Sequence, residues 1–292
     1  MKRTLGEKVF DSFNGVILFL LVIVTLYPFL YVVFASLSAS SNFMAHDGIL
    51  LAPAGFSTKA YEAVLRNKSI YIGYQNTLIY VVMGVAINIF LTSTGAYVLS
   101  RKYLRLARPI MLMIIFTMYF SGGLIPTYLL MKNMHLDNTR LSVILPGAIS
   151  TWNLLIMKTN LAAIPDSLEE SARIDGAGEW TILLKIILPL SMPIIMVMCL
   201  YYGVGHWNSW FNAMIYLRDV NLHPLQLFLR KILIQNDLKE MTGGAANSNE
   251  ASDIAVTIKY ATIMVATIPI IVVYPFIQKY FVKGTLVGAV KG

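Results

Sequence analysis

The sequence has 292 residues, of which 57% are hydrophobic and 13% are charged, and its mean hydropathy is +0.66. A soluble domain carries about a quarter charged residues, so this composition leaves too little charge for a water-exposed surface and predicts a protein embedded in a lipid bilayer. The net charge is +8, but the basic residues gather at the ends of apolar runs, as membrane topology requires, which argues against nucleic acid as a partner.

Six apolar runs follow one another along the chain. Each is long enough to cross a hydrocarbon core, which takes ~20 helical residues. They lie near residues 13–36, 70–99, 109–131, 141–161, 186–216 and 259–281. The runs are continuously apolar rather than alternating, which argues against a barrel. The sequence therefore predicts an all-α, polytopic membrane protein with about six transmembrane helices. We expect a single transmembrane domain over 1–292, with its first span at 13–36 and its core spans at 70–281.

The orientation follows from the Lys and Arg residues of the short loops. The loop after the second run has four basic residues and no acidic one, namely Arg101, Lys102, Arg105 and Arg108. This pattern places the loop and both termini in the cytoplasm. The two long loops, 38–69 and 217–258, then lie outside; basic residues in the second do not decide against this, because long loops translocate largely regardless of charge.

The loop between the fourth and fifth runs, residues 164–189, has the sequence IPDSLEESARIDGAGEWTILLKIILP. Ser167 and Glu170 have the spacing of a capping box, which predicts a short helix that begins at Ser167. Glu169 and Arg173 are four residues apart in the favoured order of an ion pair.

The same loop predicts a turn and a second helix. Gly176 suits the left-handed position that ends a helix, and Glu179 suits the first turn of the next one. A helix as short as the first is marginal alone in water. It must therefore pack on the rest of this protein or on a partner, and an interfacial amphipathic helix is the alternative.

At these residues the chain resembles the permease subunits of ATP-binding-cassette importers. The resemblance is carried by the spacing of that family's EAA loop, with Ser171 in place of an alanine: Glu170, Ser171, Ala172, Gly176, Ile186, Leu188 and Pro189. The stretches ARIDGAGEW, HWNSWFNAMIYL and QKYFVKGTLVGAVKG resemble the carbohydrate-importer branch. Within that branch, nearly the whole chain is similar to the inner subunit of the maltose-transporter type, and more so to the polysaccharide or complex-sugar permeases.

The resemblance implies the importer type I permease fold and a role for the loop at 164–189. In such importers the EAA loop forms a coupling helix that sits in a cleft of the cytoplasmic ATPase. Glu170 would supply a charge for a basic group, Ala172 would allow close approach, and Gly176 would make the turn. The implied coupling residues are Ser167, Glu170, Ser171, Ala172, Arg173, Asp175 and Gly176.

The C-terminal tail, residues 282–292, would also contact the ATPase by resemblance, through Lys283, Gly284 and Lys291. The alternative is a frayed terminus anchored by its positive charges.

The resemblance further implies an assembly. A second permease subunit, expected to be a distinct homologue, would join a dimer of ATP-binding-cassette ATPases and an extracellular or periplasmic sugar-binding protein at the bacterial cell membrane. This chain has no GxxxxGK[ST] phosphate loop. We therefore expect a non-catalytic subunit without a cofactor of its own, with ATP and Mg bound by the partner ATPase.

The fifth run has residue types that bind sugars, namely aromatic rings and side-chain amides. Trp207 and Phe211 are four residues apart, as are Asn208 and Asn212, so each pair would share one face of a continuous helix. Amides in a span are costly unless they face water or a partner, which predicts that these four residues line the substrate path. The alternatives are an interfacial aromatic belt and hydrogen bonds of the amides between helices.

Two other function classes fit the sequence less well. An ion-driven secondary transporter, the main alternative, would need acidic residues within its spans, and the spans have essentially none. An intramembrane enzyme would need a nucleophile with a base or a set of metal ligands, but neither GxSxG nor HExxH occurs, and Cys199 is the only cysteine. No catalytic or metal residue is predicted. The expected function is that of a permease subunit that forms half of the path for a sugar, an oligo- or polysaccharide.

Overall fold

The structure is a computed structural model that describes residues 4–235, 254 and 256–289, without the side chains of residues 5, 235 and 276–289. Contacts within the chain divide it into two compact units. One unit consists of Met1–Ile70 and Leu229–Ile268, and the other of Tyr71–Phe228 and Pro269–Gly292. Two long helices therefore continue from one unit into the other. The expectation of one transmembrane domain stays a prediction.

The first unit is built around the first apolar run. Its elements are α1 (Leu5–Ser36), α2 (Ser40–Met44), α3 (Lys59–Arg66) and the first turns of α17 (Thr257–Ala289). Helix α1 begins earlier than predicted because Thr4 and Glu7 form a capping box, in which the Thr4 amide donates to Glu7 Oε2 at 2.8 Å. Tyr31, Phe43 and Tyr260 pack edge to face with ring centroids 5.4–6.1 Å apart, and fix α1, α2 and α17 to one another.

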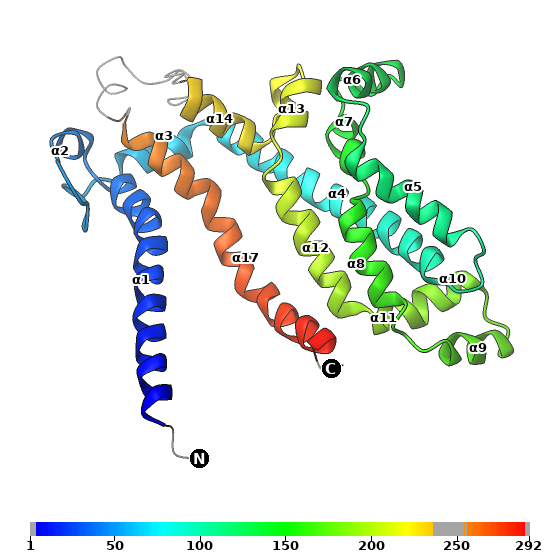
Figure 1. The fold of residues 1–292 in the computed structure, drawn as a ribbon. Helices are drawn as coiled ribbons and strands as arrows, with labels where there is room; N and C mark the ends of the chain where they lie inside the picture. The colour runs from blue at the N-terminus through cyan, green and yellow to red at the C-terminus, as the bar shows by residue number, and fades with distance from the viewer. Residues whose placement is uncertain (1–3, 236–253, 255, 290–292) are drawn as a thin grey trace. The chain divides into compact units, whose positions relative to one another are not determined.

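The second unit contains the second to fifth apolar runs, apart from Ile70, and the part of the sixth run that begins at Pro269 (Figure 1). Its helices are α4 (Lys68–Ser100), α5 (Ala107–Tyr119), α6 (Leu124–Asn133), α7 (Arg140–Ile144), α8 (Thr151–Leu161), α9 (Ser167–Ile174), α10 (Glu179–Ile182), α11 (Leu188–Leu190), α12 (Met192–Trp207) and α13 (Phe211–Tyr216). The shorter elements are the 3₁₀ turns η1 (Leu145–Gly147) and η3 (Val220–Leu222) and the π-helical η2 (Leu183–Ile187), and α14 (Leu225–Gln235) leads back to the first unit.

Three helices among the described residues are each long and apolar enough to cross a membrane, and they match the predicted first, second and sixth spans: Gly6–Ser36, Lys68–Ser100 and Thr257–Pro275. The other three predicted spans are bent pairs. The bend is 113° between α5 and α6, 55° between α7 and α8, and 84° between the Glu179–Leu190 segment and α12. The prediction of about six transmembrane helices is confirmed when each bent pair is taken as one span.

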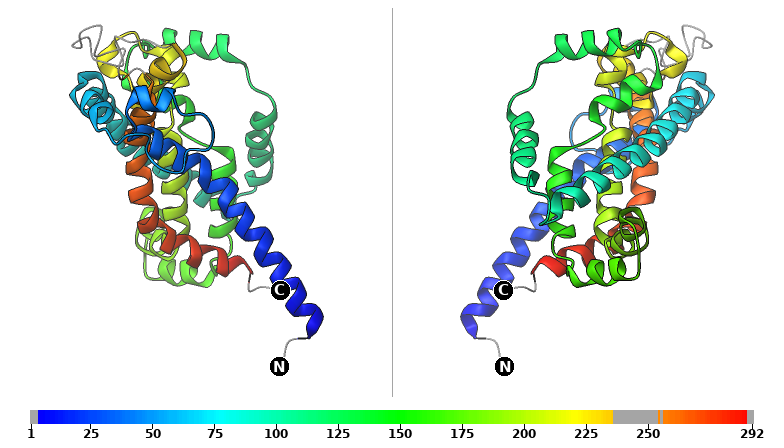
Figure 2. Two further views of the ribbon diagram at one scale, coloured as in Figure 1. Left: turned by 90° about the vertical axis from the view of Figure 1, so that its left-hand side faces the viewer. Right: turned by 90° about the vertical axis from the view of Figure 1, so that its right-hand side faces the viewer.

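The bends have local causes. Between α5 and α6 the chain leaves the helix at Phe120 and passes through Gly123 at φ +88°, so α6 turns away from α5 (Figures 1 and 2). The second bend follows the 3₁₀ turn with Pro146 as its second residue, and the third has Pro189 and Pro193 on its two sides. Proline removes a helical hydrogen bond and so favours a break.

The backbone groups that the bend between α7 and α8 leaves without helical partners are bonded by neighbouring helices. Asn88 of α4 donates its amide to the carbonyls of Gly147 and Ala148, at 2.9 and 2.7 Å. The hydroxyl of Tyr202 accepts from the amide of Ser150 at 3.1 Å. Such bonds are what permits a broken helix at membrane depth.

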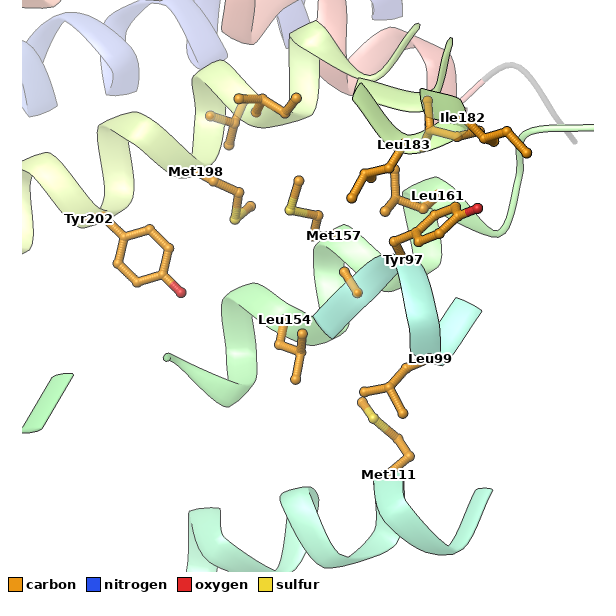
Figure 3. Packing of buried hydrophobic residues seen from close by; sticks show 14 of the residues in the cluster. Tyr97, Leu99, Met111, Leu154, Met157, Leu161, Ile182, Leu183, Met198 and Tyr202 are labelled. Carbon is orange, nitrogen blue, oxygen red and sulfur yellow. The ribbon is translucent and has the colours of Figure 1, made fainter. Parts of the chain in front are cut away.

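The core of the second unit lies where α4, α8, α12 and the segment from α10 to α11 meet. Figure 3 shows Tyr97 of α4, Met157 and Leu161 of α8, and Met198 of α12 in this cluster. Met157 and Met198 are fully buried. The cluster extends to Ala172 of α9, so the short loop helix packs on the same core as the apolar helices.

Candidate functional site

Helix α9 occupies the loop in which the sequence predicts a short helix and a glycine turn, and both are confirmed. It runs from Ser167 to Ile174, and Gly176 follows at φ +79°. Within the second unit it lies at the opposite end from α6 and α13 (Figure 1). The predicted capping box is wrong, because the N-cap is Asp166 and no side chain caps the helix. Ser167 is already the first helical residue.

A buried ion pair fixes the middle of α9. Arg101, in the turn after α4, donates Nη1 to Oε1 of Glu169. The two residues are only 5% and 4% exposed. Arg101 also donates Nε to the carbonyl of Tyr97 at 3.3 Å and Nη2 to the carbonyl of Leu161 at 3.4 Å, and its guanidinium lies 4.7 Å from the Tyr97 ring centroid. Burial lowers the pKa of the Arg101 guanidinium from its ordinary value, but an arginine remains charged at neutral pH.

A second network fixes the last turn of α9. Arg173 donates Nη2 to Oε1 of Glu179 at 2.8 Å and to the hydroxyl of Tyr103 at 3.3 Å. Glu179 also accepts from the hydroxyl of Tyr97 at 2.7 Å. The predicted Glu169–Arg173 pair is present at 3.9 Å. Glu179 thus joins the second loop helix, α9 and α4.

The start of α9 has an exposed ion pair. Lys102 donates its ammonium to Oδ2 of Asp166 at 2.7 Å, and both side chains are more than half exposed. This hydrogen bond and the lysine charge hold the pKa of the Asp166 carboxyl below its usual value. The carboxyl therefore stays ionised through the neutral range, but the exposure of the pair limits what it adds to stability.

Most of the residues implied as coupling contacts are exposed on α9 or in the turn after it. Ser167, Glu170, Ser171, Arg173, Asp175 and Gly176 are exposed. Ala172 is 8% exposed and lies in the hydrophobic core of this chain. Its small side chain therefore allows the core of the second unit to pack closely against α9. Ile174, which sequence reasoning missed, is 86% exposed beside Asp175.

The predicted substrate-path residues do not lie on one continuous helix. Helix α12 ends at Trp207 and α13 begins at Phe211, so the premise of shared helical faces is wrong. Asn208 is the C-cap of α12 and donates its side-chain amide to the carbonyl of Val204 at 3.0 Å. Asn208 and Phe211 are exposed, whereas Asn212 is half-buried and donates to the carbonyl of Val143 at 3.5 Å.

Trp207 is buried and lines an apolar cavity of about 950 Å³ in the second unit. Side chains of α4, of the segment from α10 to α12 and of the middle of α17 form its wall, almost all of them apolar. The Trp207 Nε1 group has no hydrogen-bond partner among the described residues. Sugars require donors and acceptors, so this cavity suits apolar groups better than a saccharide.

The predicted tail contacts fall largely outside the described residues. Helix α17 continues to Ala289, which makes the backbone of Lys283 and Gly284 helical. The side chain of Lys283 and all of Lys291 lie outside the described residues.

Comparison with known proteins identifies the family. Residues 109–287 match the family described as binding-protein-dependent transport system inner membrane component. The polygalacturonan/rhamnogalacturonan transport system permease protein YtcP of Bacillus subtilis (strain 168) is 41% identical over 291 residues, which are 98% of this chain and 99% of that protein. Protein LplC of the same strain is 38% identical over 292 residues, or 100% of this chain and 98% of that protein. This chain belongs to that family.

A solved structure agrees with the assignment. It is described as a bacterial ABC transporter involved in the import of the acidic polysaccharide alginate. The match has a TM-score of 0.87 and 31% identity, and covers 96% of this chain and 99% of the other. The expected importer permease fold is confirmed.

The chain is therefore a multi-pass permease subunit of an ATP-binding-cassette carbohydrate importer, and it is the non-catalytic membrane component. The alternative of an ion-driven secondary transporter is excluded by this membership. Importers of this family have a partner permease, an ATPase and a substrate-binding protein.

Three residues in or beside α9 were not predicted from the sequence to have a role, although each had a partial signal there. Arg101 was interpreted only as a sign that its loop is cytoplasmic, because basic residues in short loops usually mark that side of the membrane. Glu169 was noticed as an i,i+4 partner of Arg173, but its burial could not be anticipated. The signal for Ile174 was an isolated large apolar residue in an otherwise polar helix.

Proposed function

We propose that this permease and a distinct homologous permease form the path through which an oligosaccharide derived from an acidic polysaccharide enters the cell. The substrate class is supported by two similar proteins, one named for polygalacturonan and rhamnogalacturonan and the other for alginate. Relatives named for arabinooligosaccharides or for melibiose, raffinose and stachyose are only 26% identical. A uronate carboxylate is the chemical feature that the polymers named in the more similar proteins share.

In this proposal both termini and α9 lie in the cytoplasm, and α9 docks on one subunit of an ATPase dimer that binds ATP and Mg. The coupling role is supported by the bonds that hold α9 against the rest of this chain. Its inward side is bonded to this chain at Asp166, Glu169 and Arg173, while Glu170 and Ile174 project outward. A short rigid helix with a free outer face can pass a rigid-body displacement to the helices behind it.

The outer face offers two kinds of contact. Glu170 and Asp175 provide negative charges for basic groups of the ATPase, and Ile174 provides an apolar anchor. Exposed apolar residues rimmed by polar ones are typical of protein interfaces. Lys283, Gly284 and Lys291 of the tail remain part of the same proposed contact.

The proposed substrate path includes Trp207, Asn208, Phe211 and Asn212. Asn208 and Phe211 are exposed, so an amide and a ring are available to a sugar's hydroxyl groups and apolar face. Trp207 and Asn212 lie deeper, and they would contribute by supporting the break between α12 and α13.

Uptake measurements test the function. A strain that lacks the permease would be complemented with the chain and given labelled oligogalacturonide or a labelled neutral arabino-oligosaccharide of the same length. We expect ATP-dependent uptake of the oligogalacturonide and little uptake of the neutral sugar. Equal uptake of both would refute the acidic substrate class, and uptake driven by an ion gradient without ATP would refute the importer assignment.

A further inference from the structure

The turn after α4, residues Arg101 to Tyr103, contacts every turn of α9. Lys102 bonds Asp166 at the start, Arg101 bonds Glu169 in the middle, and Tyr103 accepts from Arg173 at the end. Three consecutive residues at the end of one long helix therefore fix a whole neighbouring helix. The orientation of the chain in the membrane explains why such a turn has basic residues, but it does not explain why they pair with acidic residues of the loop at 164–189.

The three contacts are not equivalent. The Arg101–Glu169 side chains are 4% and 6% exposed, whereas those of Lys102 and Asp166 are 83% and 52% exposed. Exposed pairs tolerate rearrangement, since water replaces the partner. A buried pair does not, because separation would leave both charges without solvent. The Arg101–Glu169 contact is therefore the one that must stay intact when α9 moves.

Arg101 is also firmly attached to α4 and α8. Its Nε donates to the Tyr97 carbonyl and to the Ser100 hydroxyl, at 3.3 and 3.1 Å, and its Nη2 donates to the Leu161 carbonyl at 3.4 Å. The guanidinium donates to Glu169 and also to oxygen atoms of α4 and α8, and it therefore joins Glu169 to the ends of these two core helices. The planar geometry of arginine makes such a junction rigid.

Helix α4 in turn contacts the break between α7 and α8. Asn88 of α4 donates to two carbonyls of that break. Thr92 of α4 shares a hydrogen bond with the hydroxyl of Tyr202. A displacement of α9 that pulls on Arg101 thus acts on the helix that supports the bend.

We propose that Arg101 and Glu169 form a positioning pair that passes the ATPase-driven displacement of α9 to α4 and α8. Glu169 faces away from the docking surface and acts through Arg101. The inference rests on the proposed docking of α9, and it adds a second requirement, that the docked helix stay bonded to the core.

The test uses the complete importer, with both permeases and the ATPase, reconstituted in lipid vesicles with its binding protein. Glu169→Gln removes one charge of the buried pair, and Lys102→Gln is the matched control because it removes one charge of the exposed pair that joins the same turn to the start of α9. Two rates are measured for each complex, ATP hydrolysis and uptake of the saccharide. We expect Glu169→Gln to assemble and hydrolyse ATP, with uptake per ATP reduced about tenfold, a typical size of energetic coupling between two sites. For Lys102→Gln we expect a change within about twofold.

Wild-type uptake per ATP in the Glu169→Gln complex, or an equal loss in both variants, would overturn the positioning role. If Glu169→Gln fails to assemble, Arg101→Lys keeps the charge and removes the planar fork. That variant should assemble and lose uptake per ATP, and normal coupling in it would also overturn the proposal. A wild-type complex that neither hydrolyses ATP nor moves saccharide would refute the proposed function instead, so the two failures are distinguishable.

Discussion

Gly84 is the position at which a single methyl group should most clearly disturb the second unit. A Cβ atom on Gly84 would lie 2.3 Å from Nε2 of His206 and 2.6 Å from two carbon atoms of the same ring. Those distances are far below van der Waals contact, so the ring must move. His206 is 8% exposed and its Nε2 donates to Oδ1 of Asn88 at 2.6 Å, which leaves the ring little room to do so.

The expected cost of Gly84→Ala has three contributions. Overpacking of a buried site costs about 1–3 kcal/mol, and loss of a buried hydrogen bond costs about 1–3 kcal/mol. The better helix propensity of alanine offsets about 1 kcal/mol. We therefore expect a loss of roughly 3 kcal/mol in the free energy of unfolding, seen as a fall of several degrees in the thermal denaturation midpoint of the detergent-purified protein.

Gly203→Ala is the matched control. A Cβ atom there would meet the Val85 Cγ2 atom at 3.8 Å, an ordinary contact, so this variant should match or slightly exceed the wild type. Equal midpoints for the two variants would show that the packing of His206 against Gly84 is not as tight as the structure has it.

Three further predictions concern other positions. Asn88→Ala should lower the free energy of unfolding by about 1–3 kcal/mol, because two carbonyls at the α7–α8 break and the buried ring of His206 lose their partner; chemical denaturation in mixed micelles measures this, and an unchanged midpoint would contradict it. Ile174→Asp should lower co-purification of the ATPase about tenfold while the yield of the permease itself stays constant, since the exposed side chain adds nothing to the fold. Asn208→Ala should reduce saccharide uptake without lowering the yield of the complex; a loss of yield alone would mean that Asn208 only caps α12.

The sequence predicted well those features that local chemistry determines. The first, second and sixth spans are unbroken apolar helices, and composition alone identifies such segments. The glycine turn at Gly176 was also predictable, because its positive φ favours a residue without Cβ.

The sequence did not reveal where the apolar runs break. Gly123 and Pro126 lie within 109–131, but the run was predicted as one span, and these residues alone do not predict that it divides into α5 and α6 with a 113° bend. The breaks are stabilised by distant groups, as at Gly147, where Asn88 supplies the missing donor from another helix. The same holds at Asn208, which could have continued a helix by propensity but ends α12 and leaves Trp207 and Phe211 on separate segments.

The candidate site shows the same division. The residues of α9 were predicted, but the reason for its rigidity lies in Arg101, 68 residues before its partner Glu169. A basic residue in a short loop and a buried ion-pair partner look identical in sequence, because burial is decided by tertiary packing.

The central claim, that α9 docks on the ATPase, is tested most directly by cross-linking in the assembled importer. Because Cys199 is the only cysteine of the chain, Cys199→Ser gives a background in which one new thiol can be placed. Ile174→Cys on α9 and Met134→Cys at the end of α6 are both exposed and lie at opposite ends of the second unit. With a thiol-reactive photo-cross-linker, we predict an adduct between permease and ATPase from Ile174→Cys and none from Met134→Cys. An intact complex in which Ile174→Cys gives no ATPase adduct would contradict the account.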